Sequence, residues 1–144
     1  MDIEKRIHEA FRTLGERQTA PRRAIAQKLI RLGRSGQAFS AEELLRKLRR
    51  TYPRIGRATV YRSIEALVRM KVLDRIEFAD GTHSFRLCGS DQHHHHLACT
   101  KCHRVIEVDF CLEAGAIDAI GKQESFTIAD HSLTLFGLCR ECRD

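Results

Sequence analysis

The chain has 144 residues, 42% of them hydrophobic, and a formal net charge of +6. A chain of this length and composition can bury a core, which excludes a disordered tail and a fibrous repeat. No apolar run reaches the ~18 residues that a membrane span needs, and residues 1–10 are charged rather than apolar as in a signal peptide. We therefore expect a soluble, cytoplasmic protein with no membrane partner.

Hydrophobic periodicity predicts four helices in the first half of the chain. Residues that favour helix ends stand at the boundaries, and Ser40 with Glu43 has the spacing of a capping box. The first predicted helix has an apolar repeat that ends at Leu14, and Gly15 follows it as a stop. The second lies between Pro21 and Gly33, the third lies between Ser40 and Pro53, and the fourth begins at Thr59.

A β-hairpin is predicted after these helices. Residues 72–78 and 83–87 are β-prone segments on either side of an Asp80-Gly81 turn. Helices followed by a hairpin are typical of a winged helix-turn-helix, in which the last helix enters the major groove of DNA. The same pattern also fits a small helical bundle that ends in a hairpin.

The second half alternates β-prone and helical segments. Strands are predicted at residues 95–98, 105–108 and 126–136, and a helix over about residues 112–122. The predicted fold class is therefore α+β with two domains. These are a winged helix-turn-helix at residues 1–88, with its wing at about 72–88, and a small metal-binding α/β domain at residues 89–144.

Four of the six cysteines form two C-x-x-C pairs, Cys99 with Cys102 and Cys139 with Cys142. In a reducing cytosol, two such pairs indicate a tetrahedral Zn²⁺ site more readily than disulfides. The 36 residues between the pairs exceed the linker of a compact zinc ribbon, so an α/β unit should fold between them. The alternative is a pair of independent redox motifs.

Charge is divided unevenly between the two halves. Residues 1–88 carry 20 Lys and Arg against 10 Asp and Glu, whereas residues 89–144 carry 5 against 9. The basic half favours a polyanion such as double-stranded DNA, and the acidic half, rich in Cys and His, favours metal cations. The alternative is that both surfaces are ordinary solvated ones.

The order of motifs along the chain resembles the ferric uptake regulator superfamily. The motifs that carry this resemblance are Ala58–Arg62, the histidine run His93–His96, the first C-x-x-C pair, Val105–Glu107, and His131–Leu133 ahead of Cys139. The resemblance implies a homodimeric, metal-activated transcriptional repressor. In such a protein the C-terminal domain mediates dimerisation, and the four cysteines hold a structural zinc ion.

A second set of residues indicates the sensed metal. Iron and peroxide sensors of the superfamily carry a histidine just before the Ser40–Glu42 motif, where this chain has none. Asp74, Cys88, His94 and His96 instead resemble the sensing site of the zinc uptake regulator branch. One thiolate, two imidazoles and one carboxylate suit regulatory Zn²⁺, which makes iron or manganese less favoured. The alternatives are an iron- or peroxide-responsive repressor and, for Cys88, a purely structural role.

The histidine run should split into two sets, because alternate residues of a strand point to opposite faces. The set opposite the sensing histidines could form a third metal site, like the second C-terminal site of the superfamily, or could simply be solvated. Cys111 has no partner at C-x-x-C spacing and is expected to be buried. The expected ligands of the third site are His93, His95, His131 and either Glu113 or Glu107.

The resemblance assigns DNA binding to the fourth helix, and the start of the second helix offers contacts to the DNA backbone. Arginine can bind guanine edges or phosphate, and tyrosine contacts thymine methyl groups or phosphate. Two-fold symmetry of the dimer predicts a palindromic operator. The expected DNA-binding residues are Arg57, Thr59, Tyr61 and Arg62 on the fourth helix, and Arg22 and Arg23 on the second.

These observations favour a regulator that represses zinc-uptake genes. In it, one Zn²⁺ ion would connect the wing to the dimerisation strand and so enable operator binding. An enzyme with a small-molecule substrate is not expected, because the zinc-hydrolase and deaminase motifs H-E-x-x-H and H-x-E with P-C-x-x-C are absent. A zinc-stabilised adaptor that binds only protein is the other alternative. The charge division and the Ala58–Arg62 helix argue against it.

Overall fold

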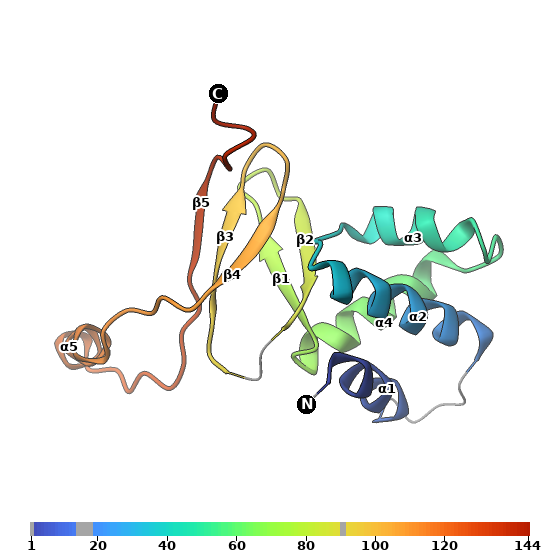
Figure 1. The fold of residues 1–144 in the computed structure, drawn as a ribbon. Helices are drawn as coiled ribbons and strands as arrows, with labels where there is room; N and C mark the ends of the chain where they lie inside the picture. Colours follow the sequence, from blue (N-terminus) through green and yellow to red (C-terminus); the bar gives the residue numbers. More distant parts are fainter. Residues whose placement is uncertain (1, 14–18, 90–91) are drawn as a thin grey trace.

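The computed structural model describes residues 2–13, 19–89 and 92–144 (Figure 1). The described first half contains helices and an antiparallel two-stranded hairpin. The predicted end of the first helix, at Leu14 and Gly15, lies outside the described residues. In chain order the elements are α1 (Ile3–Thr13), α2 (Ala20–Ser35), α3 (Ala41–Arg49), α4 (Arg57–Arg69), β1 (Leu73–Glu77) and β2 (His83–Leu87).

Two helix boundaries differ from the prediction. Helix α4 begins at Arg57, two residues earlier than expected. Helix α2 does not stop at Gly33 but continues to Ser35, and Gly36 ends it in the left-handed region at φ 64°. Gly33 is a packing residue instead. A Cβ atom there would lie 2.7 Å from Cδ1 of Leu87, so glycine allows β2 to approach α2 closely.

The predicted capping box and hairpin are both confirmed. The Ser40 hydroxyl accepts a hydrogen bond from the Glu43 N–H at 3.1 Å, and the Glu43 carboxylate accepts one from the Ser40 N–H at 2.9 Å. These two bonds satisfy N–H groups that the first turn of α3 would otherwise leave without partners. Strands β1 and β2 pair antiparallel from Leu73 opposite Leu87 to Glu77 opposite His83.

The helices and the hairpin share one apolar core. Strand β1 follows α4 directly and packs against it, and β2 packs against α2 and α3. A hairpin that contributes to the helical core is a wing, so the winged helix-turn-helix is confirmed over the simple bundle. The core includes Ile7, Ile25, Leu29, Leu44, Leu48, Val60, Leu67, Leu73 and Phe85.

The second half contains β3 (His95–Cys99), β4 (Val105–Val108), α5 (Ala114–Glu124) and β5 (Thr134–Gly137). The sheet order is β4-β3-β5, with β4 antiparallel and β5 parallel to β3. The strand expected over residues 126–136 is therefore wrong for most of its length. Because β3 has only five residues, a parallel neighbour can pair along no more than that, and β5 pairs over four.

The wing and the sheet meet in a second, much smaller apolar cluster. Ile76 and Phe78 of the hairpin contact Ala98 and Val105 of the sheet, with Ala38 packed beside them. In Figure 1, α5 lies at the opposite end of the molecule from α2 and α3. Within the described ranges, no helix has the length and apolar character of a membrane span.

Candidate metal centres and nucleic-acid interface

The four cysteines predicted to bind zinc come together at one end of the sheet. Parallel pairing of β3 with β5 places Cys99, at the end of β3, close to Cys139 and Cys142, which follow β5. All four sulfur atoms lie within 4.8 Å of one another, and the sulfurs of Cys102 and Cys139 are 3.7 Å apart. The 36-residue interval contains β4, α5 and β5, as the long spacing predicts.

Backbone N–H groups stabilise a thiolate in this cluster, which favours the binding of a cation. The N–H groups of Cys102 and Cys139 hydrogen-bond to the sulfur of Cys99 and lower its pKa to about 6, so it is largely a thiolate at neutral pH. The hydrogen bond with the Cys139 sulfur, together with burial, raises the pKa of Cys142 to about 12. Such close sulfurs cannot all ionise unless a cation neutralises them, and the thiolate is the form that binds metal.

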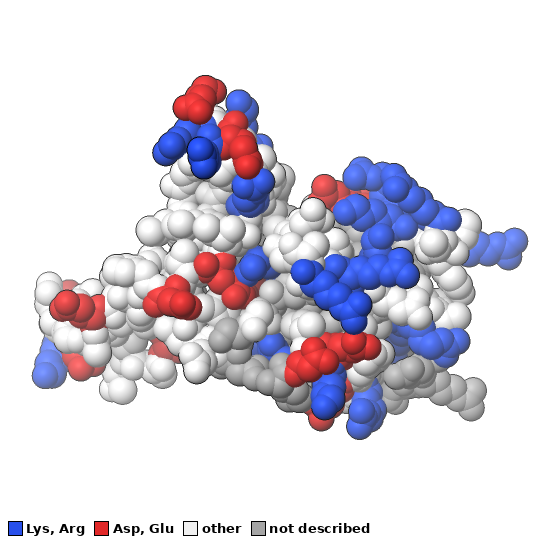
Figure 2. Space-filling model, viewed as in Figure 1, with Lys and Arg blue, Asp and Glu red and all other residues white. Residues whose placement is uncertain are grey.

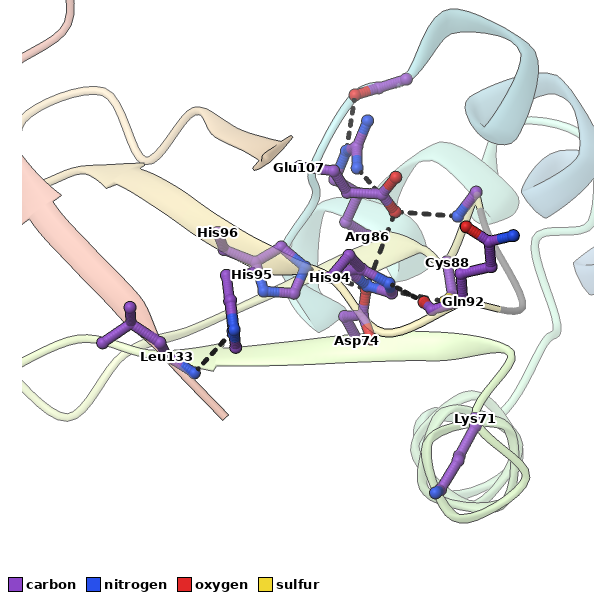
Figure 3. Close-up of polar contacts among 12 residues, drawn as sticks. Lys71, Asp74, Arg86, Cys88, Gln92, His94, His95, His96, Glu107 and Leu133 are labelled. Atoms are coloured by element: carbon purple, nitrogen blue, oxygen red, sulfur yellow. Dashed lines mark hydrogen bonds and ion pairs between the residues drawn. The ribbon is translucent and has the colours of Figure 1, made fainter. Parts of the chain in front are cut away.

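A second cluster lies between the wing and the sheet, and we call it the hinge cluster. It consists of Asp74 on β1, His94 directly before β3, His96 on β3 and Glu107 on β4 (Figure 3). The Nε2 atoms of His94 and His96 lie 2.8 and 3.0 Å from Oδ2 of Asp74. The histidine side chains are 11% exposed and that of Asp74 21%, so little water screens these groups.

The hydrogen bonds of His94 favour a cation in the hinge cluster. Its Nδ1 atom can only donate to the carbonyl oxygen of Gln92, at 2.9 Å, so in the neutral ring Nε2 carries a lone pair directed at Asp74. Two acceptors 2.8 Å apart require a proton or a metal ion between them. Burial would raise the pKa of Asp74, but the hydrogen bonds of His96 and His94 outweigh it and lower the pKa below its usual value. The carboxylate is therefore ionised.

Three of the predicted sensing residues, Asp74, His94 and His96, lie in this cluster, whereas Cys88 lies beside it and Glu107, which was not expected here, takes the fourth place. The sulfur of Cys88, a buried residue, lies 3.7 Å from Nε2 of His94. Glu107, whose Oε1 is also 3.7 Å from that nitrogen, is the fourth member of the set whose ligand atoms all lie within 4.8 Å, and Cys88 is not a member of that set. The Glu107 carboxylate is also bound by Arg86 at 3.0 Å and by the Gly89 N–H at 2.8 Å.

A third cluster occupies the opposite face of β3, as the alternation predicts. Nε2 of His93 lies 3.0 Å from the Nε2 atoms of both His95 and His131. The sulfur of Cys111 lies 3.3 Å from Nε2 of His95 and 3.2 Å from Nε2 of His131. Figure 3 shows His95 directed toward Leu133, whose N–H donates to Nδ1 at 3.2 Å, and away from Asp74. With no cation bound, that contact assigns the His95 ring proton to Nε2.

Two expectations for this third cluster need correction. The fourth group in contact with the histidines is Cys111, whereas Glu113 is at the N-cap position of α5 without a side-chain capping hydrogen bond and Glu107 belongs to the hinge cluster. Cys111 was expected to be buried, but it is exposed. Cys111 was not expected here because the resemblance implies a carboxylate as the fourth ligand and Cys111 has no partner at C-x-x-C spacing. The position of Cys111 just after β4, near the strand that carries the histidines, was the available clue.

The residues expected to bind DNA line the start of α4. Glu42 of α3 accepts a hydrogen bond from the Tyr61 hydroxyl at 2.6 Å and forms an ion pair with Arg57. The Arg57 guanidinium also lies 5.9 Å from the centre of the Tyr61 ring. Hydrogen bonds from Tyr61 and Arg57 lower the pKa of Glu42, so its charge persists. The sequence analysis assigned Glu42 no contact with these side chains.

The remaining expected DNA contacts lie on two helices. Arg62 is exposed on α4, whereas Thr59 is half-buried and its carbonyl accepts a hydrogen bond from the Ser63 hydroxyl. Arg22 and Arg23 lie in the first turn of α2, half-buried and exposed respectively. Figure 2 shows Lys and Arg side chains gathered over the helical half of the molecule. The surface offered by this half is therefore suited to a polyanion.

Comparison with known proteins agrees with this arrangement. A sequence model of the ferric uptake regulator family matches residues 13–136. The chain is 34% identical to the ferric uptake regulation protein of Bacillus subtilis, over 97% of this chain and 91% of that protein. It is 36% identical to the zinc uptake regulation protein of Mycobacterium tuberculosis, over 90% of this chain and 96% of that protein. The solved structure of the Vibrio cholerae ferric uptake regulator superposes with a TM-score of 0.66 at 30% identity, covering 96% of this chain and all of that one.

Proposed function

This chain belongs to the ferric uptake regulator family of metal-responsive transcriptional regulators, and we propose that it is a zinc-dependent repressor of zinc-uptake genes. It would bind a palindromic operator in double-stranded DNA as a homodimer. The single observation that carries the proposal is the hinge cluster, whose donors come from the wing on one side and from the sheet on the other.

The proposed mechanism depends on how little else joins the wing to the sheet. Their shared apolar cluster has four buried residues, far fewer than the core of the winged helix. The remaining connection includes polar contacts of Asp74 with His94 and His96 and of Arg86 with Glu107. It also includes ring contacts of Phe78 with His103 and Phe136. A bound Zn²⁺ would join these donors and restrict the orientation of the DNA-binding domain, which lowers the ordering cost of operator binding.

The choice of zinc rests on Cys88. With this thiolate as fourth ligand, Asp74, His94 and His96 form a set that suits tetrahedral Zn²⁺. Glu107 is already neutralised by Arg86 and the Gly89 N–H, which favours Cys88 as the ligand. The four-cysteine cluster would hold a second, structural Zn²⁺.

A second candidate function is iron sensing, which one observation favours. If Glu107 rather than Cys88 completes the hinge cluster, its donors are two imidazoles and two carboxylates. Nitrogen and oxygen donors of this kind suit Fe²⁺ or Mn²⁺ better than a thiolate site does. The fourth ligand therefore decides between the two functions, and the two residues can be tested separately.

The surface of the second half supports a homodimer. Most of the large hydrophobic side chains that the structure exposes lie between residues 97 and 138, on the sheet, on α5 and on the segments around them. Exposed apolar surface of this extent marks an interaction site. Within the described chain β5 has a hydrogen-bonded neighbour on one side only, so its free edge could pair with a second copy. The exposed side chains include Leu97, Ile106, Phe110, Leu112, Ile120, Phe126, Ile128, Leu135, Phe136 and Leu138.

In the proposed complex, α4 enters the major groove with Arg57, Tyr61 and Arg62 at its exposed start. Thr59 would lie at the same end of the helix, and Arg22 and Arg23 would contact phosphates from the first turn of α2, where the helix N-terminus also favours anions. Operator binding should accordingly weaken steeply with salt.

The test begins with operators selected from a random duplex library at saturating Zn²⁺. Affinity for the selected duplex is then measured across buffered free Zn²⁺ and, without oxygen, free Fe²⁺. We expect zinc to strengthen binding at lower free concentration than iron. The response to zinc should be lost in Cys88→Ser and retained in the matched variant Glu107→Gln. Loss in Glu107→Gln alone, with an iron response in the wild type, would instead support the iron sensor. Binding that no metal affects would refute both.

A further inference from the structure

We propose that Cys111 is a thiolate ligand of a third metal site, completed by His93, His95 and His131, that takes Zn²⁺ or another thiophilic divalent cation. The inference extends the metal-responsive role proposed above, but it does not depend on which metal the hinge cluster takes.

The geometry of the four side chains carries this proposal. Three imidazole Nε2 atoms and one sulfur lie within 4.8 Å of one another, and no carboxylate belongs to the group. In a tetrahedral zinc site with bonds of about 2.0–2.3 Å, neighbouring ligand atoms are about 3.3–3.6 Å apart. The distances here are 3.0 Å between His93 and the other two nitrogens, and 3.2–3.3 Å from them to the sulfur. These four pairs need to move apart by only a few tenths of an ångström to reach the spacing of a tetrahedral site.

Hydrogen bonding alone does not account for this convergence. A neutral imidazole has one N–H donor, and Nε2 of His93 lies at the same distance from the Nε2 atoms of His95 and His131. The Nε2 proton of His95 can be donated to only one partner, and a metal ion would displace it, as metal binding to protein ligands generally does. The cluster is also held in place from outside, because the Leu133 N–H orients the His95 ring.

The thiolate determines which metals the site selects. A cysteine ligand favours Zn²⁺ and other thiophilic ions over Mn²⁺ and Mg²⁺, which prefer oxygen donors. Had Glu113 supplied the fourth ligand, the site would have been open to the harder ions. Glu113 is exposed and its backbone begins α5 instead.

The ligands also show what the site would hold together. His93 and His95 belong to the central strand and the residues before it, whereas Cys111 and His131 lie on either side of α5. A metal bound to all four would therefore fasten both ends of the segment that carries α5 to β3 (Figure 1). That segment bears several of the exposed apolar side chains of the proposed dimer surface, including Leu112, Ile120 and Phe126.

Cobalt titration of the full-length protein tests the proposal, because thiolate ligation to Co²⁺ gives a near-ultraviolet charge-transfer band. The four-cysteine cluster is kept filled with zinc, and Cys88→Ser removes the other thiolate near a labile site. In this background we expect the band to persist, to disappear on adding Cys111→Ser, and to be unchanged by adding Glu113→Gln. An unchanged band in Cys111→Ser, or weakened cobalt binding in Glu113→Gln, would overturn the assignment.

A measurement without substitutions at the site guards against misfolding of the variants. Alkylation of Cys111 by N-ethylmaleimide, followed by mass spectrometry, should be suppressed once Zn²⁺ exceeds the amount that fills the other two sites. Continued alkylation at saturating zinc would refute ligation. Failure of operator binding to respond to metal, with the cobalt band intact, would refute the proposed repressor function and leave this site standing.

Discussion

Replacing Asp74 by asparagine should weaken metal binding at the hinge while preserving the fold. The carboxylate contacts both His94 and His96 through Oδ2, at 2.8 and 3.0 Å. An asparagine amide has the same shape and can donate to the Nε2 lone pair of His94, so the metal-free contact is retained. What is lost is the ionised oxygen ligand and its charge.

The size of the effect follows from the ligand count. Loss of a group that supports a metal ligand typically reduces affinity by about 10–100-fold, which is about 1.4–2.7 kcal/mol, and we expect the loss of a ligand to cost at least this much. At a free zinc concentration ten times its dissociation constant, the wild-type site is about 90% filled. The same concentration would fill the Asp74→Asn site to about 50% for a 10-fold loss and about 9% for a 100-fold loss. The zinc concentration at half-maximal operator binding should rise by the same factor.

Fluorescence anisotropy with a labelled operator, titrated with buffered zinc, measures this shift. Asp80→Asn is the matched control, because Asp80 lies in the turn of the same hairpin, is exposed and bonds only to Thr82 among the contacts described. An Asp74→Asn curve that overlays the wild-type curve would remove this carboxylate from the sensing site. A shift of the same size in the control would show that the effect is not specific to the hinge.

Three further predictions concern other parts of the molecule. Cys139→Ala should strongly lower the thermal midpoint of unfolding of the second half, because structural zinc contributes about 10–16 kcal/mol in zinc-finger peptides. Circular dichroism with and without a chelator measures this, and a variant as stable as the wild type would contradict the prediction. Glu42→Gln removes a negative charge beside Arg57 and Tyr61, which are proposed to contact DNA, so it should strengthen binding to a non-cognate duplex at low salt more than at high salt. Gly33→Ala should lower the free energy of unfolding in urea by about 1 kcal/mol. Overpacking against Leu87 Cδ1 at 2.7 Å costs about 1–3 kcal/mol, which exceeds the gain in helix propensity of about 0.5–1 kcal/mol. An unchanged free energy of unfolding would contradict this and mean that the Leu87 side chain rotates away.

The first half of the chain could be predicted well because its signals are local. Capping by Ser40, helical periodicity and the Asp80-Gly81 turn each act within a few residues, and all three reappear in the structure. The helix boundary predicted at Gly33 was wrong because this glycine makes room for the side chain of Leu87, which lies on a strand more than fifty residues later. No local pattern distinguishes such a glycine from a helix stop.

The candidate sites were predictable only in part. Spacing and alternation identify both C-x-x-C pairs and the two faces of the histidine run. The acidic and sulfur ligands depend instead on how the sheet places β4 and the residues after it. Glu107 pairs opposite His96 in the β3–β4 register and so reaches the hinge, while Cys111 reaches the other face. Neither position follows from the sequence spacing.

The register of β3 connects the four-cysteine cluster to the hinge cluster. Parallel pairing sets His96 opposite Thr134 and Cys99 opposite Gly137, so the cysteines that follow β5 bind together at the end of the same ladder. If β3 slipped by one residue in its pairing with β5, the two faces of β3 would be exchanged. His95 rather than His96 would then point toward Asp74. Metal held by the four cysteines would oppose that slip although it touches no sensing residue. Cys139→Ala should therefore abolish the zinc response of operator binding even at temperatures where the winged helix remains folded.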